Sequence, residues 1–255
     1  MPVVSWKTEG AITRLTLEQP EKLNALGEDA ARDFSAAVRR VTREKSKVVI
    51  LSGRGKAFCA GGDLGFIEKN RERPKAALQP IMKRFYASFL SIRDLPQVTI
   101  AQVHGAAVGA GLCLALACDL RAVSADAKLG FNFVRLGLNP GMAAWPLARG
   151  VFGDARAREL LFVGRFFTGA QLHQWGGAAL DVQESELGAE TEKLAAEIAG
   201  HSRQSLSWLK KETRLDAPLA PYLALEARGQ AECFKGADIA EGVAAIRARR
   251  APEFR

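Results

Sequence analysis

The N-terminal two-thirds of the sequence repeats one order of elements: a short apolar run, a glycine-rich turn and a helical pattern. The first run is residues 48–51 and ends at Gly53, and the second is residues 98–103 and ends at His104-Gly105. Runs of this length, without polar alternation and rich in β-branched residues, are typical of strands buried on both faces. Strands that alternate with helices in this way predict an α/β fold.

The remaining elements follow from the same patterns. We expect a hairpin of two strands at 6–8 and 12–17 around Glu9-Gly10, and another strand at 120–124. Apolar residues at helical spacing predict helices at 27–41, 74–95, 112–117, 155–163, 169–175, 184–199, 205–215 and 221–234. Strand signals thin out after about residue 153, so we expect an α/β core over residues 1–190 and a helical region over residues 191–255.

Charge and targeting signals limit the partners. The chain carries 36 basic and 28 acidic residues among 255, a net charge of +8, which suggests nucleic acid or a phosphate-rich cofactor as partner. No RNA-stacking or helix-turn-helix pattern occurs, so we expect no nucleic-acid partner. The sequence shows no signal peptide and no membrane-spanning run, which predicts a cytoplasmic protein without membrane contact. The four cysteines form no C-x-x-C pair, so we expect neither structural zinc nor disulfides.

Two glycine-rich turns, at 53–64 and 103–112, each join a buried strand to a helix. Backbone N–H groups at such turns are unpaired and carry partial positive charge. Two of them aimed at one point would hold the oxygen of a thioester as it gains negative charge. Tight packing of helix against strand also explains the glycines. Phosphate-binding loops fit less well, because the G-x-x-x-x-G-K-[S/T] pattern is absent and 109–111 lacks the third glycine of a dinucleotide site.

Four segments, in order from residue 20 to residue 254, resemble the motifs of the enoyl-CoA hydratase/isomerase (crotonase) family. They are PEKLNAL at 20–26, KAFCAGGDL at 56–64, VHGAAVGAGLCLALACDL at 103–120 and EGVAAIRARRAPEF at 241–254. The resemblance implies a crotonase-like spiral of ββα units with a helical C-terminal trimerisation region. It also implies an acyl-CoA substrate and a homotrimer or a dimer of trimers.

Carried over by position, the resemblance implies an oxyanion hole made by the N–H groups of Gly62 and Ala110. Ala110 stands where the family has the middle glycine of G-G-G. Alanine keeps the amide, so we expect this departure to be mild. The implied coenzyme A contacts are Lys22, Ala60, Gly62, Asp63 and Leu64. Asp63 is also the expected N-cap of a helix that begins at Leu64. Coenzyme A would enter as part of the substrate, with no tightly bound cofactor and no metal.

The glutamate pair of the family's hydratases is missing. Its two positions are occupied by Cys113 and Phe133, and Gly141 stands where some isomerases and dehalogenases have an aspartate. Paired carboxylates move the protons of hydration, so we expect poor hydration. Isomerisation, decarboxylation and thioester hydrolysis remain open. A catalytically silent acyl-CoA-binding subunit and an RNA-binding relative are the alternatives to an enzyme.

Two polar groups remain as candidates near the predicted site. Cys113, at the start of a helix, is either a thiol with a lowered pKa or an inert buried thiol. Asn139 lies in the loop that faces the site and is suited to orient a water molecule or a carbonyl group. Apolar residues predicted to line an acyl pocket are Phe66, Phe85, Phe133, Leu138, Met142 and Trp145.

Overall fold

The computed structural model describes residues 2–214, 219–235, 237–248 and 250–254. The strands are β1 (Val4–Glu9), β2 (Ile12–Leu17), β3 (Val48–Gly53), β4 (Val98–Val103), β5 (Ala106–Val108), β6 (Leu120–Ser124), β7 (Lys128–Gly130), β8 (Phe166–Thr168) and β9 (Leu180–Val182). The helices are α1 (Glu28–Val41), α2 (Leu64–Arg71), α3 (Lys75–Leu90), α4 (Ala110–Ala117), α5 (Ala144–Val163), α6 (Gly169–Gln174), α7 (Glu184–Ala199), α8 (Arg203–Glu212), α9 (Leu219–Lys235) and α10 (Ala237–Ala248).

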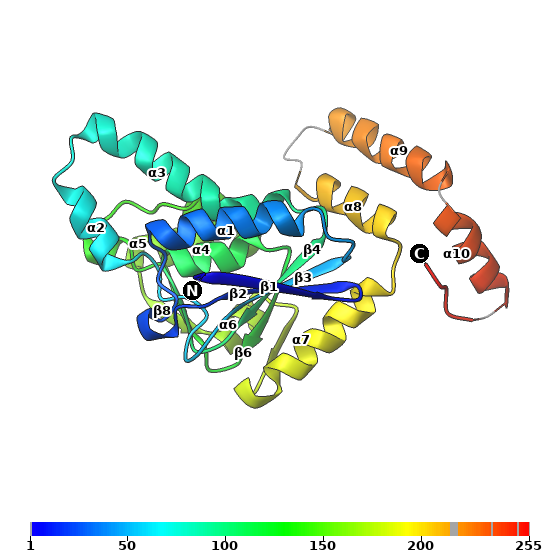
Figure 1. The fold of residues 1–255 in the computed structure, drawn as a ribbon, viewed down its shortest axis with the longest axis horizontal. Coiled ribbons are helices and arrows are strands. Elements are labelled where there is room, and N and C mark those ends of the chain that lie inside the picture. Colours follow the sequence, from blue (N-terminus) through cyan, green and yellow to red (C-terminus); the bar gives the residue numbers. More distant parts are fainter. Residues whose placement is uncertain (1, 215–218, 236, 249, 255) are drawn as a thin grey trace.

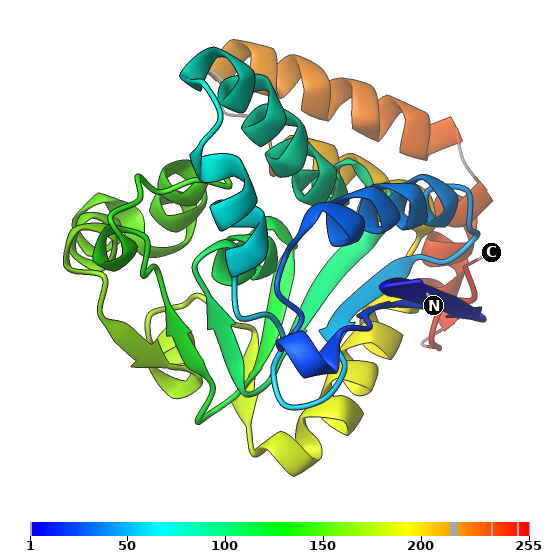
Figure 2. The same ribbon diagram turned by 60° about the vertical axis from the view of Figure 1, so that its left-hand side comes forward.

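The strands form two sheets. The larger has the order β1-β2-β3-β4-β6-β9, in which β1 and β2 are antiparallel and every later pair is parallel. The smaller has the order β5-β7-β8. Helices α1, α3 and α4 lie on one side of the large sheet and α7 lies on the other (Figures 1 and 2).

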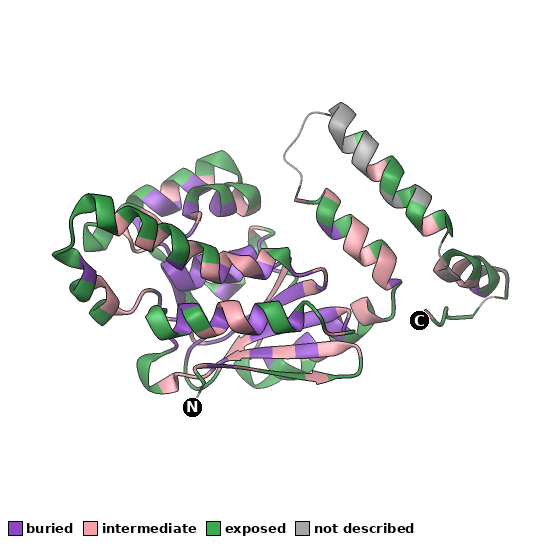
Figure 3. Cartoon of the chain, turned by 45° about the horizontal axis from the view of Figure 1, so that its top comes forward, coloured by how far each residue is buried: buried purple, intermediate pink, exposed green. Residues whose placement is uncertain are grey.

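Burial on both faces explains the apolar runs of the central strands. In β3, Val49 and Leu51 belong to the main core beneath α1 and α4, whereas Val48 and Ile50 belong to the core beneath α7. A strand covered on both sides needs apolar residues at every position rather than at alternate ones. Buried residues accordingly run through the whole centre of the molecule (Figure 3).

Most predicted elements are present, with four kinds of difference. The predicted 74–95 helix ends at Leu90 and continues as a 3-10 turn. The predicted 155–163 helix is the second half of α5, which has a non-helical Gly153 at its centre. The three-residue strands β5, β7, β8 and β9 were not predicted, because so short a segment shows no period. Helix α10 was not predicted either, and the predicted 205–215 helix in fact begins at Arg203 and ends at Glu212, with residue 215 outside the described residues.

The C-terminal helices extend away from the sheets. Helix α7 packs on the large sheet, so the expected division at residue 190 falls inside a helix of the core. Helices α9 and α10 lie on the outer side of α8 (Figure 1). No helix in the described ranges combines the length and the apolar character that a bilayer span needs.

A buried cluster of charges fastens α8 to the core. The Lys210 ammonium lies 2.7 Å from the Asp119 carboxylate, and the Arg214 guanidinium lies 3.1 Å from its other oxygen. Thr99 donates to the same carboxylate from its amide (2.7 Å) and its hydroxyl (2.8 Å). Burial opposes ionisation of Asp119, but Lys210, Thr99 and Arg214 outweigh it and lower its pKa. The side chain of Lys210 is only 4% exposed, so this ion pair is shielded from water.

We predict that Lys210→Ala destabilises the protein by about 3 kcal/mol, because it leaves the largely buried Asp119 carboxylate with Arg214 as its only ion-pair partner among the described residues. Lys69→Ala is the matched control, since it removes an exposed lysine paired with Glu28 and costs at most about 1 kcal/mol. Urea unfolding of both variants and the wild type measures the two losses. Equal losses would contradict a structural role for the cluster.

Candidate active site

The two glycine-rich turns lie against each other and form one edge of a cleft. The amide of Cys59 donates to the carbonyl of Ala106 (3.0 Å), and the amide of Val108 donates to the carbonyl of Cys59 (3.1 Å). This parallel bridge leaves no room for side chains between the turns. A Cβ at Gly111 would overlap the carbonyl oxygen of Cys59, and one at Gly61 would lie 2.7 Å from the carbonyl oxygen of Val108. Both glycines are therefore required by close approach of the backbones.

Each turn contributes to the cleft one residue whose amide has no acceptor among the residues that the structure describes. On either side of Gly62, Leu26 donates to the carbonyl of Gly61 (2.7 Å) and Asp63 donates to the carbonyl of Leu26 (2.9 Å). The Gly62 N–H lies between these bonds and faces away from Leu26. Ala110 is the first residue of α4, so its N–H has no intrahelical acceptor. Neither amide bonds to any residue that the structure describes, and both residues line the cleft.

Alanine at 110 fits the local backbone. The left-handed angle in this turn falls on Gly109, with φ of 54°, whereas Ala110 belongs to the helix. The position that needs glycine is therefore one residue earlier, and the methyl group of Ala110 costs no backbone strain.

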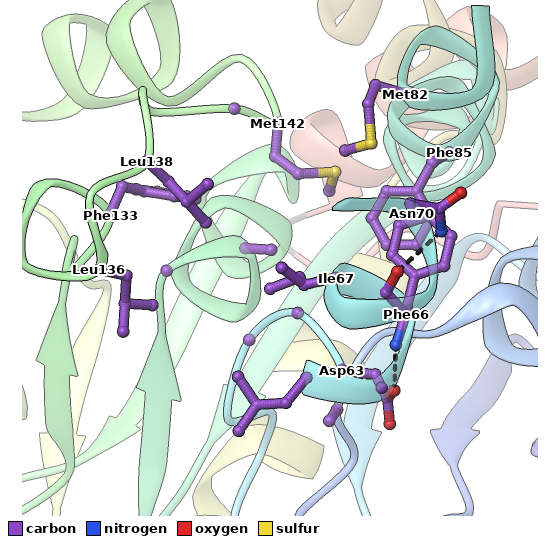
Figure 4. A pocket seen from close by; sticks show the side chains of 18 of the residues that line it. Asp63, Phe66, Ile67, Asn70, Met82, Phe85, Phe133, Leu136, Leu138 and Met142 are labelled. Atoms are coloured by element: carbon purple, nitrogen blue, oxygen red, sulfur yellow. Dashed lines mark hydrogen bonds between the residues drawn. The ribbon is translucent and has the colours of Figure 1, made fainter. Parts of the chain in front are cut away.

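The cleft has a volume of about 940 Å³ and is mostly apolar. Its walls come from the two turns, from α2 and α3, and from the loop at 132–142 (Figure 4). The structure brings together the predicted residues Lys22, Ala60, Gly62, Asp63, Leu64, Phe66, Phe85, Ala110, Phe133, Leu138, Asn139 and Met142. Phe66 and Phe85 stack with ring centroids 4.6 Å apart, which makes a rigid apolar wall.

Charged groups stand at the rim of the cleft. Asp63 accepts a hydrogen bond from the Phe66 amide (2.8 Å, dashed in Figure 4), which confirms it as the N-cap of α2. Its second carboxylate oxygen lies 3.8 Å from the ammonium of Lys22, whose side chain is 56% exposed. Arg71 also lines the cleft. Asp63 is the one carboxylate on the walls that the structure describes, and both of its oxygens are already engaged.

Trp145 does not belong to the acyl pocket, and that prediction is wrong. Met142 and Ala143 both adopt left-handed angles, with φ of 56° and 54°, and so the chain turns sharply before α5 begins. Trp145 therefore faces a second cleft beside α8, where the guanidinium of Arg158 lies 5.0 Å from its ring. Proximity to Met142 in the sequence did not predict which cleft Trp145 lines, because the turn directs the two side chains to different surfaces.

Cys113 is a buried thiol and does not line the cleft. Its side chain is inaccessible, and its sulfur lies 3.8 Å from the carbonyl oxygen of Gly141. Burial raises the pKa of Cys113, so the thiol is protonated at neutral pH. The alternative of a low-pKa nucleophile is thus contradicted, since a helix start lowers a thiol pKa only where the thiolate is solvated or paired.

Several residues of the cleft were not predicted as site residues. Tyr86 brings a hydroxyl from α3, Asn70 comes from α2, and Asn132 lies beside Gly109. The sequence places Tyr86 only within the predicted 74–95 helix. No spacing rule identifies it, because its position in the site depends on Gly141 in a distant loop.

Comparison with known proteins gives a family match along nearly the whole chain. The model of the enoyl-CoA hydratase/isomerase family matches residues 7–255. The 1,2-epoxyphenylacetyl-CoA isomerase of Escherichia coli K12 is 32% identical over 99% of this chain and 97% of its own length. A probable enoyl-CoA hydratase of Rhodobacter capsulatus is 31% identical over 98% of this chain and 97% of its own. An enoyl-CoA hydratase structure from Polaromonas sp. JS666 superposes with a TM-score of 0.93 and 27% identity, covering 99% of both chains.

The fold is thus a crotonase fold, which confirms the predicted spiral of ββα units and the helical C-terminal region. The chain belongs to the enoyl-CoA hydratase/isomerase family.

We predict that Cys113 resists alkylation in the native protein. Because burial raises its pKa, the reactive thiolate is scarce at pH 8, and the reagent cannot reach the sulfur. Cys233 is partly exposed and should react first with iodoacetamide, as measured by mass spectrometry of proteolytic peptides. Unfolded protein, in which all four cysteines react, is the control. Rapid labelling of native Cys113 would contradict its burial.

Proposed function

We propose that the protein is an enzyme acting on acyl-CoA thioesters, in which the N–H groups of Gly62 and Ala110 form an oxyanion hole. The observation that carries this proposal is the pair of unpartnered amides on the wall of one apolar cleft. Such donors stabilise the negative charge that develops on a thioester oxygen, either in an enolate or in a tetrahedral intermediate. They are fixed by the backbone, so they need no reorganisation during the reaction.

The charged rim suits the coenzyme A portion of such a substrate. Lys22 and Arg71 provide positive charge at the opening, where the phosphates would lie, while Ala60 and Leu64 offer apolar contacts. We propose that the net charge of +8 serves these phosphates rather than nucleic acid. Coenzyme A is then part of the substrate, and no other cofactor is required.

The reaction that we propose is one in which stabilisation of an enolate or oxyanion supplies most of the rate enhancement. Hydration needs a group that activates water and a group that protonates carbon, and Cys113 and Phe133 supply neither. Isomerisation, decarboxylation and thioester hydrolysis remain open, since each passes through an enolate or an oxyanion that the two amides would stabilise. The similar Escherichia coli protein is named an isomerase of a CoA thioester, which favours isomerisation among the three.

A catalytically silent acyl-CoA-binding subunit is the second candidate. It is favoured by one observation: in the described part of the cleft, the single carboxylate, Asp63, caps α2 and faces Lys22. Such a subunit would keep the binding geometry without turnover. For either candidate we propose assembly as a homotrimer or a dimer of trimers in the cytoplasm, through the C-terminal helical region.

We predict that the protein binds acetyl-CoA and crotonyl-CoA, because the cleft offers both the oxyanion donors and a positive rim. Isothermal calorimetry with these ligands and free coenzyme A measures this. Crotonyl-CoA hydration should be feeble, since an acid–base group typically contributes about 10²–10⁴-fold. Absence of binding at millimolar ligand would remove the proposal. Hydration at a typical enzymic rate of about 10 per second would show that other groups perform the acid–base chemistry of the missing glutamates.

We predict that Ala110→Pro lowers kcat on the true substrate by about 10²–10³-fold, the usual loss for one oxyanion donor. Proline is well tolerated at the first position of a helix, so the variant removes the N–H while α4 remains. Ala110→Gly keeps the amide and is the matched control. Full activity in a folded Ala110→Pro protein, checked by its melting temperature and oligomeric state, would place the oxyanion elsewhere.

A further inference from the structure

Tyr86 places a phenolic hydroxyl at a point where the loop backbone makes room for it. A Cβ at Gly141 would overlap the hydroxyl oxygen of Tyr86 and would lie 2.7 Å from Cζ of its ring. Every residue other than glycine at 141 would therefore collide with the tyrosine. The two positions form a matched pair, in which the hydroxyl fills the space that a side chain of the loop would occupy.

The Tyr86 hydroxyl forms no hydrogen bond with any residue that the structure describes. Tyr86 is nevertheless partly buried and lines the cleft. Its ring is held edge-on against Phe85, with centroids 6.2 Å apart, so the direction of the hydroxyl is fixed by packing. Burial raises the pKa of Tyr86, so at neutral pH the group is an uncharged O–H donor.

The cleft that Tyr86 lines is mostly apolar. Phe85, Met82 and Met142 line the same cleft, and these three side chains converge in Figure 4. Because the hydroxyl has no partner among the described residues, we expect a water molecule to bond it when the cleft is empty. An acyl chain that fills the cleft displaces this water, and an unsatisfied donor then costs binding free energy unless the chain supplies an acceptor.

We propose that Tyr86 is a specificity-determining residue that donates a hydrogen bond to an oxygen atom on the acyl chain. The cleft would then select oxygen-substituted acyl thioesters over plain saturated ones of the same length. This inference rests on the proposed acyl-CoA function and adds the chemical class of the acyl group to it.

The test compares four ligands of one chain length: butyryl-CoA and its 2-hydroxy, 3-hydroxy and 4-hydroxy derivatives. Calorimetry on the wild type should show at least one hydroxy ligand bound about tenfold more tightly than butyryl-CoA, the ratio expected for one buried donor. Tyr86→Phe keeps the ring and removes the hydroxyl. Because it removes the donor that butyryl-CoA leaves unsatisfied, it should bring that ratio to about one, mainly by tightening the binding of butyryl-CoA.

Two further variants serve as controls. Met82→Leu alters the same wall without a polar group, and it should change all four affinities alike. Gly141→Ala adds a methyl group that displaces Tyr86, and it should lose the preference as Tyr86→Phe does.

The outcomes distinguish failure of the role of Tyr86 from failure of the proposed acyl-CoA function. Equal binding of all four ligands to the wild type, or a preference that survives in folded Tyr86→Phe, would overturn the role of Tyr86 and leave the acyl-CoA function standing. Absence of binding by any of the four would overturn the proposed function, and the inference with it.

Discussion

Everything at the cleft depends on how closely two stretches of backbone approach each other. The turns after β3 and β4 are joined by the Cys59–Ala107 bridge, and glycine at 61 and 111 is what allows the contact. Once the turns meet, the amides of Gly62 and Ala110 have no acceptor within the described protein and remain available to a ligand. A central sheet buried on both faces supplies the rigid base that holds this geometry.

Backbone chemistry of this kind tolerates change in the surrounding side chains. The proposed oxyanion hole needs only an N–H in the right place, so alanine at 110 is compatible with it, and the proposed loss of the family's glutamates would not disturb it. What changes is the set of reactions that the remaining groups support. In this chain the open positions are filled by Cys113, which is sealed in the core, and Phe133, which is apolar. Tyr86 is then the one phenolic group on the described wall of the cleft.

The sequence was informative where a local rule decides the outcome. The buried strand at 48–51 and the Asp63 cap follow from apolar patterning and helix-end chemistry, and both are present. It was misleading at Trp145, where two left-handed residues redirect the chain, and apolar composition cannot reveal a turn of that kind. It was silent on Tyr86, because that role depends on packing between α3 and a loop far along the chain. The short strands of the second sheet were missed because three residues are too few to show a period.

The most direct test of the central claim is the vibrational frequency of the bound thioester carbonyl. Isotope-edited infrared difference spectra, taken with acyl-CoA labelled with ¹³C at the thioester carbon, isolate this one bond in the complex. Two hydrogen bonds from Gly62 and Ala110 polarise the carbonyl, so the account predicts a stretch at lower frequency when bound than in water, and a partial return in Ala110→Pro. An unchanged frequency in a saturated wild-type complex would contradict the oxyanion hole.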